Sequence, residues 1–194
     1  MAAARFDVRE ARRMSLKNEW LIVVDMQRAF ADSPSPWAAP GFYAALAQVE
    51  RLLPTYRGRT ILTRYVPPKV LAGAWIPYFA MFPSLLRPED DPLWDLKLPA
   101  HGGALVETRT TFGKWDEPMA ALTGPGAPIA VCGVATECCV LSTILGAVDH
   151  GRFVRLVSDA CAAGSPQGDA ETLAILAGFA PMVSVAKTDE ILST

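Results

Sequence analysis

A cysteine and an aspartate in this sequence each follow a run of apolar residues, which is where α/β proteins place reactive side chains. Cys139 stands in Gly133–Val140 (GVATECCV), after the apolar run Ala127–Cys132 and before a helical pattern that continues from Leu141. In the first turn of a helix, unpaired N–H groups and the helix dipole stabilise a thiolate. The pattern therefore predicts a nucleophilic thiol at a strand end, with Thr136 as the N-cap of the helix.

Simple core packing is the alternative explanation for such a cysteine, and we expect it to hold for Cys132 and Cys161. For Cys139, a second feature favours chemistry. The apolar run Trp20–Val24 (WLIVV) predicts a buried strand that leads directly into Asp25. In a parallel sheet both carboxyl ends lie at the same edge, so the acid and the thiol indicate a base and a nucleophile.

These two segments resemble the isochorismatase-like cysteine hydrolases, a family that includes nicotinamidases and N-carbamoylsarcosine amidases. The resemblance extends over about Glu19–Ala186 and rests on Ile22–Phe30 (IVVDMQRAF) and Val131–Val140 (VCGVATECCV). It implies a hydrolase that cleaves the C–N bond of a small-molecule amide through a thioester intermediate. In that role Cys139 is the nucleophile and Asp25 is the base.

The resemblance also implies an oxyanion hole and a catalytic cation. A cis peptide in the family corresponds here to Val134–Ala135, so the N–H groups of Ala135 and Cys139 are expected to hold the oxyanion. The family's lysine stands at a strand end with a fixed spacing to two aromatic residues, and that spacing selects Arg109 in RTTFGKW. A guanidinium can stabilise a neighbouring thiolate, although it is bulkier than an ammonium and keeps its proton. Lys114 is the alternative.

Aromatic residues are expected to line the substrate pocket. The resemblance assigns Phe30, five residues after the aspartate, and the loop after the second strand, which gives Tyr65 and Trp75; Thr136 completes the substrate-binding set. The segment Val66–Ala100 is rich in proline and aromatics and too long for a passive connection. We interpret it as a wall of the binding site, a partner contact or both.

Alternating strand and helix patterns predict a three-layer, Rossmann-like α/β fold, with an open parallel sheet of about six strands and helices on both faces. The chain length suits one domain, residues 19–194, preceded by an N-terminal arm, residues 1–18. The expected strands are about Trp20–Val24, Arg59–Arg64, Gly103–Thr108, Pro128–Cys132, Phe153–Ser158 and Met182–Val185, and the expected helices are about Phe42–Pro54, Asp116–Leu122, Thr136–His150 and Gln167–Gly178.

Composition and missing motifs exclude several functions. A net charge of −2 with mixed signs gives no nucleic-acid or anionic-membrane surface, and no apolar run is long enough to span a bilayer. Neither His101 nor His150 is expected near Cys139, so a cysteine–histidine pair is not predicted. Leu62–Pro68, where nicotinamidases of the family hold a metal, carries no such ligands. We expect no metal, no cofactor and a small-molecule substrate.

Cell compartment, assembly and rival functions complete the expectations. Four cysteines without the spacing of a disulfide framework favour a reducing cytoplasm. The apolar content of 51% favours a homo-oligomer, a dimer or tetramer as is common in the resembling family.

One rival function is ether hydrolysis of the isochorismatase type. The other is a non-catalytic binding or redox-sensing protein, which Arg109 in the lysine position would support.

Overall fold

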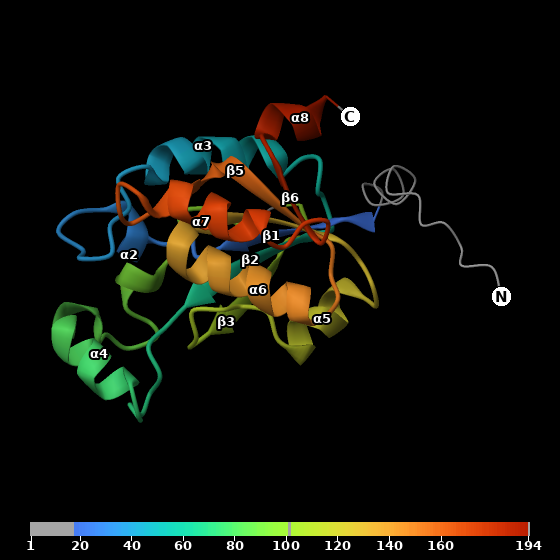
Figure 1. Cartoon of the computed structure of the whole chain (residues 1–194). Helices are drawn as coiled ribbons and strands as arrows, with labels where there is room; N and C mark the ends of the chain where they lie inside the picture. The colour runs from blue at the N-terminus through green and yellow to red at the C-terminus, as the bar shows by residue number, and fades with distance from the viewer. Residues whose placement is uncertain (1–17, 101, 194) are drawn as a thin grey trace.

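A single parallel sheet of six strands organises the computed structural model, which describes residues 18–100 and 102–193. The strand order is β3-β2-β1-β4-β5-β6 (Figure 1). The strands are β1 (Trp20–Val24), β2 (Thr60–Tyr65), β3 (Leu105–Arg109), β4 (Ile129–Val134), β5 (Val154–Ala162) and β6 (Val183–Ala186). The predicted α/β fold is confirmed. The expected N-terminal arm lies outside the described residues except for its last one.

Helices cover both faces of this sheet (Figure 1). Helices α3 and α8 contact each other and β5, whereas α6 and α7 pack on β5 from the other side. The helices are α2 (Arg28–Ala31), α3 (Phe42–Leu52), α4 (Trp75–Met81), α5 (Glu117–Thr123), α6 (Leu141–Asp149), α7 (Gly168–Ala177) and α8 (Thr188–Leu192). Among the described residues, no helix has the length and apolar character needed to cross a membrane.

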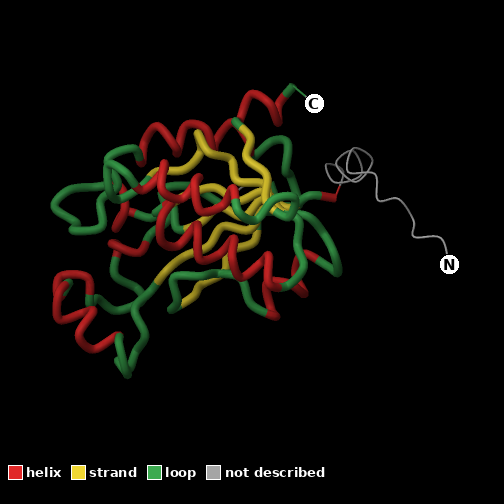
Figure 2. Tube along the Cα trace, viewed as in Figure 1, coloured by secondary structure: helices red, strands yellow, loops and turns green. Residues whose placement is uncertain are grey.

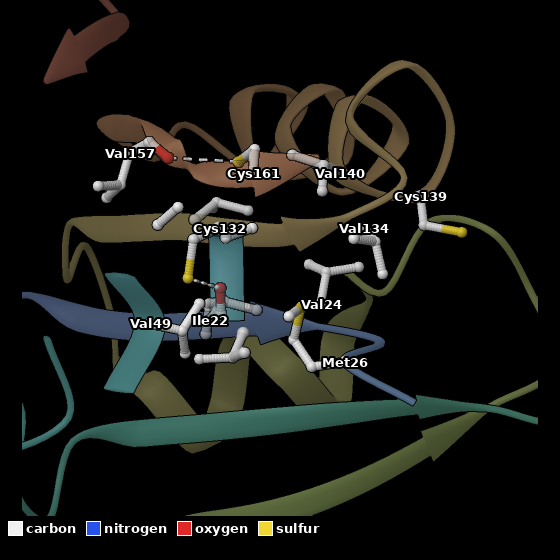
Figure 3. Packing of buried hydrophobic residues seen from close by; sticks show 14 of the residues in the cluster. Ile22, Val24, Met26, Val49, Cys132, Val134, Cys139, Val140, Val157 and Cys161 are labelled. Atoms are coloured by element: carbon white, nitrogen blue, oxygen red, sulfur yellow. Dashed lines mark hydrogen bonds between the residues drawn. The ribbon is translucent and has the colours of Figure 1, made fainter. Parts of the chain in front are cut away.

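The two central strands are buried on both faces, because successive side chains of a strand point to opposite sides and helices cover each side. Every residue of β4 is buried, as are the last four of β1. Figure 3 shows Ile22 and Val24 of β1 packed near Cys132 and Val134 of β4. This rigid centre fixes the carboxyl ends of β1 and β4 beside each other.

The helix expected from Thr136 to His150 begins differently from the prediction. A π-helical turn, η3 (Thr136–Val140), comes first, and α6 continues from it. Ala135 occupies the N-cap position, so the prediction that Thr136 caps this helix is wrong. The Thr136 hydroxyl is buried and has no hydrogen-bond partner among the described residues.

The long segment between β2 and β3 contains structure that the sequence pattern did not predict. It holds α4 and two short 3₁₀ turns, Pro83–Leu85 and Pro92–Trp94. Figures 1 and 2 show α4 standing away from the sheet. The segment returns to the body of the protein near Leu96, which forms a β-bridge with Gln27.

Candidate active site

Asp25 follows directly after β1 and is completely buried. Its backbone has a φ of 50°, a conformation that few residues other than glycine adopt. Thr63 of β2 fixes this arrangement from the neighbouring strand. The Thr63 hydroxyl accepts the backbone N–H of Asp25 at 3.2 Å and donates to its Oδ1 at 2.8 Å. The carboxylate is therefore held at the edge of the sheet where the sequence predicted it.

Lys114 is the cation beside this carboxylate. Its Nζ lies 2.8 Å from Asp25 Oδ2, and neither side chain has any exposed surface. The ammonium also donates to the carbonyl of Thr111 at 2.7 Å and lies 4.9 Å from the centre of the Tyr65 ring. A buried ammonium with an ion pair, a hydrogen bond and an aromatic face is well compensated.

Arg109, which the sequence placed next to the aspartate, contacts other carboxylates. Its guanidinium donates to Asp116 at 2.8 Å and to Glu107 at 2.7 Å. Although partial burial disfavours its charge, these hydrogen bonds raise the pKa of Arg109. The prediction that Arg109 accompanies Asp25 is wrong, because Arg109 is held by Glu107 and Asp116 while Lys114 reaches the buried carboxylate instead.

Cys139 lies in the turn η3, just beyond β4, and is 3% exposed. Figure 3 shows its sulfur beyond the end of β4, directed away from the packed side chains of Ile22, Cys132 and Val140. A hydrogen bond with the Cys138 thiol, burial and the charge of Asp25 raise the pKa of Cys139, and the charge of Lys114 lowers it.

The sequence predicted a thiol activated by a helix terminus, whereas the influences just named favour the protonated form of Cys139. The hydrogen bond with Cys138, burial and the carboxylate of Asp25 all oppose ionisation of this thiol. Because Asp25 and Lys114 both act on the thiol of Cys139, the three side chains form one electrostatically connected group. The Asp25–Lys114 ion pair and the turn that carries Cys139 thus lie at the same carboxyl edge of the sheet, where Val24 pairs with Gly133.

The backbone between β4 and η3 has the expected form, with a cis peptide between Val134 and Ala135. The carbonyl of Ala135 accepts the N–H groups of Cys138 and Val140, at 3.0 and 3.2 Å. Gly133 allows β4 to pass close to β1. A Cβ built on Gly133 would lie 2.1 Å from the carbonyl oxygen of Val24, and the φ of Gly133 is +115°.

Aromatic rings surround one side of this group. Tyr65 lies 6.4 Å from Trp75, measured between ring centres, so these two predicted residues are together. Phe30 joins them through Trp37, which stacks on Phe30 at 5.5 Å and meets Tyr65 edge-on at 5.4 Å. Phe112 also belongs to the cluster, and its ring centre lies 5.0 Å from that of Trp75.

Two residues near the site, Trp37 and Gln27, were not predicted from the sequence. Trp37 lies in a loop without periodic pattern, so no signal marked it. Gln27 is fully buried, donates to the carbonyls of Tyr65 and Trp94, and accepts the N–H of Tyr65. Its place two residues after Asp25 was a usable signal, since a buried amide must find partners.

His150 is not part of the site. His150 lies at the end of α6, where its Nδ1 is 2.8 Å from the carbonyl of Gly146. His101 lies outside the described residues. Cys132, Cys138, Cys139 and Cys161 are free thiols.

Comparison with solved structures shows the same fold in several hydrolases. A cysteine hydrolase from Pseudomonas syringae pv. phaseolicola 1448A aligns with a TM-score of 0.77 and 18% identity, covering 91% of each chain. Pyrazinamidase of Pyrococcus horikoshii, solved in complex with zinc, aligns with a TM-score of 0.72 and 22% identity over 88% of this chain and 99% of that one. Nicotinamidase from Bacillus subtilis gives a TM-score of 0.68 and 15% identity, with 88% and 99% coverage. A comparison with curated protein sequences found no match.

The residues of this chain do not fit a zinc site of the kind that the resemblance implied for nicotinamidases. The stretch from Arg64 to Pro68 supplies no carboxylate or imidazole, the ligands that zinc would need there. Among residues 18–100 and 102–193, no group of three or more His, Cys, Asp or Glu side chains could hold a metal ion. We therefore assign no step to a metal.

The family itself is established by a match over most of the sequence. Residues 19–187 match the model of the isochorismatase domain. The six-stranded parallel sheet, with Asp25 and Cys139 just beyond the ends of the neighbouring strands β1 and β4, agrees with that match. The chain therefore belongs to the isochorismatase domain family of hydrolases.

Proposed function

We propose that the protein is a cysteine-dependent hydrolase that cleaves the C–N bond of a small-molecule amide through a thioester. The observation that carries the proposal is the fully buried Asp25–Lys114 ion pair, which shares its electrostatic environment with the Cys139 thiol. A base, a cation and a nucleophile held by separate elements at one edge of the sheet suit acyl transfer.

In the first step, the sulfur of Cys139 attacks the carbonyl carbon of the amide while Asp25 accepts the thiol proton. A C–S bond forms, and the carbonyl π electrons move onto oxygen. Lys114 favours the transient thiolate, because its charge lowers the pKa of Cys139. The N–H groups of Ala135 and Cys139 are the proposed donors to the oxyanion.

In the second step, the oxyanion re-forms the carbonyl and the C–N bond breaks. The leaving nitrogen takes the proton from Asp25, and the amine departs. Water then gives a proton to Asp25 and attacks the thioester. The C–S bond breaks, Asp25 returns the proton to the Cys139 sulfur, and the carboxylic acid leaves. The sum of these steps is one amide and one water converted to one acid and one amine.

Substrate contacts are assigned to Phe30, Tyr65, Trp75 and Thr136. The hydroxyls of Tyr65 and Thr136 are buried and have no hydrogen-bond partner among the described residues. An unpaired buried hydroxyl is costly, so both groups are suited to bind polar atoms of a substrate. The rings of Phe30 and Trp75 belong to the aromatic cluster and are assigned to its apolar part.

Two observations favour the proposed amide hydrolysis over the rival functions. A non-catalytic role rested on an arginine in the lysine position, yet Lys114 occupies the place beside Asp25. Ether hydrolysis of the isochorismatase type does not need a nucleophilic cysteine. The placement of Cys139 within the influence of Asp25 and Lys114 favours the amide reaction.

The test is an ammonia-release assay with a panel of small aliphatic and aromatic primary amides. We expect the wild type and the matched control Cys138→Ala to turn over at least one amide. Cys139→Ala is expected to lower kcat/KM by more than about a thousandfold, as for other removed nucleophiles. Retained turnover in Cys139→Ala would contradict the covalent route. Cleavage of a vinyl ether without any amide turnover would favour the ether hydrolase.

Assembly and compartment remain proposals. We infer a homo-oligomer, dimer or tetramer, that acts on a small molecule in a reducing cytoplasm; the four free thiols support the compartment. Light scattering after size-exclusion chromatography measures the assembly directly.

A further inference from the structure

Thr143 connects the lysine and the cysteine of the site through a single hydroxyl. It lies in α6 and has no exposed surface. Its Oγ1 accepts the backbone N–H of Lys114 at 3.0 Å and donates to the carbonyl of Cys139 at 2.6 Å. The donor and one acceptor position of this hydroxyl are therefore both used, and they join two segments 25 residues apart in the chain (139 to 114).

Only one of these two hydrogen bonds is common for a threonine inside a helix. A threonine inside a helix commonly donates to the carbonyl four residues earlier, which accounts for the contact with Cys139. Accepting a backbone N–H from a distant loop is not required by the helix. This second contact fixes the position of Lys114 relative to the turn that carries the nucleophile.

The loop around Lys114 is also pressed closely against α6. A Cβ on Gly113 would lie 3.3 Å from the carbonyl oxygen of Ser142, and a Cβ on Gly146 would lie 3.3 Å from Cβ of Trp115. The residues on both sides of Lys114 therefore meet the helix with little space between them. A hydrogen bond in such a packed contact holds the loop at a defined distance from α6.

From this anchored backbone, the lysine side chain reaches its partners at short range. Its ammonium is 2.8 Å from Asp25 Oδ2 and 2.7 Å from the carbonyl of Thr111. A shift of the Lys114 backbone by about 1 Å would lengthen these contacts beyond hydrogen-bond range. The charge that acts on the Cys139 thiol would then move as well.

We propose that Thr143 is a positioning residue. Its one hydroxyl fixes the position of the Lys114 ammonium relative to the Cys139 thiol. The inference rests on the proposed function and adds a residue through which two members of the site are coupled. Thr143 does not touch the reacting atoms. Its effect is exerted on the location of Lys114 and on the turn that holds Cys139.

The test compares Thr143→Val, which keeps the shape but removes the hydroxyl, with Thr143→Ser, which keeps the hydroxyl. Thr123→Val is the matched control. Thr123 is a buried helical threonine whose hydroxyl donates to the carbonyls of Met119 and Ala120 but makes no link to the lysine loop. Gly113→Ala is a second variant, since its added Cβ pushes the loop away from α6 without removing a hydrogen bond.

The first readout is the pH profile of Cys139 alkylation by iodoacetamide, with the label located on Cys139 and quantified from fragment ions in mass spectrometry. Lys114 lowers the pKa of Cys139, so a displaced lysine raises the apparent pKa. We expect a rise in Thr143→Val, a smaller rise in Gly113→Ala, and wild-type profiles in Thr143→Ser and Thr123→Val. This readout needs no substrate.

The second readout is the steady-state kinetics on an amide that the wild type hydrolyses. We expect kcat to fall about 10- to 100-fold in Thr143→Val with KM little changed, the size of loss caused by small misplacements in active sites. A wild-type alkylation profile and kcat in Thr143→Val would overturn the inference, whatever Gly113→Ala shows. If Thr143→Val does not fold, Thr143→Ala, which also lacks the hydroxyl, decides by the same criterion. Failure of the proposed function appears separately, as an absence of wild-type turnover.

Discussion

Removing one charge of the buried Asp25–Lys114 pair should cost more stability than removing both charges together. In Lys114→Met the carboxylate of Asp25 stays buried without its cation, and such uncompensated charges cost about 3–5 kcal/mol. Asp25 retains the hydroxyl of Thr63 at 2.8 Å, which places the expected loss near 3 kcal/mol.

Asp25→Asn is the complementary change and keeps an oxygen for Thr63. It leaves the ammonium with the Thr111 carbonyl at 2.7 Å and the Tyr65 ring at 4.9 Å, so its expected loss is also about 3 kcal/mol. The double variant contains neither charge and is expected to lose about 2 kcal/mol or less, since neutral replacements of buried pairs are often tolerated. The two single losses sum to about 6 kcal/mol, so the coupling free energy is at least about 4 kcal/mol.

Urea unfolding at pH 7, followed by fluorescence, measures this thermodynamic cycle. With slopes of about 2–3 kcal/mol/M, each single variant should shift the midpoint down by about 1–1.5 M. Lys69→Met, at an exposed lysine, is the control and should change stability by less than about 0.5 kcal/mol. Additive losses in the double variant, within about 0.5 kcal/mol, would refute the reasoning from the buried pair.

Two further predictions concern the sheet and the buried thiols. Gly133→Ala should lose more than about 4 kcal/mol or fail to fold, because its Cβ would lie 2.1 Å from the Val24 carbonyl; Gly126→Ala, with positive φ but open space, should lose only about 1–2 kcal/mol. Equal losses in thermal unfolding would contradict this. Burial raises the pKa of Cys132 and Cys161, so the unfolded thiols ionise first as pH rises above about 8.5. Stability should therefore fall above that pH, by roughly 1 kcal/mol per pH unit per thiol, and Cys161→Ala should flatten the decline.

The sequence was sufficient for the sheet and for two site residues because their signals are local. A continuous apolar run marks a strand buried on both faces, and the residue that ends it is placed at the carboxyl edge. Asp25 and Cys139 were located in this way. The segment holding α4 was not resolved into elements, since its prolines and aromatics carry no helical period.

Arg109 was assigned wrongly as the cation beside Asp25. Residue spacing predicts where a strand ends, but it does not predict which partner a long side chain reaches. Glu107 lies two residues before Arg109 on β3, on the same face of the strand, and the alternation of side chains was a signal for their pairing. The contacts of Lys114 with Asp25 and Thr143 join distant parts of the chain. Such tertiary contacts leave no periodic pattern in the sequence.

The most direct test of the account is to identify the atom that becomes acylated. The wild type would be mixed with 4-nitrophenyl acetate, quenched in acid within the burst of nitrophenolate, and mapped by peptide mass spectrometry. We expect one acetyl group on Cys139, unchanged labelling in Cys138→Ala, and slower acylation in Lys114→Met. An acetyl group on Cys138, or a burst that survives in Cys139→Ala, would contradict the assignment of Cys139 as the nucleophile.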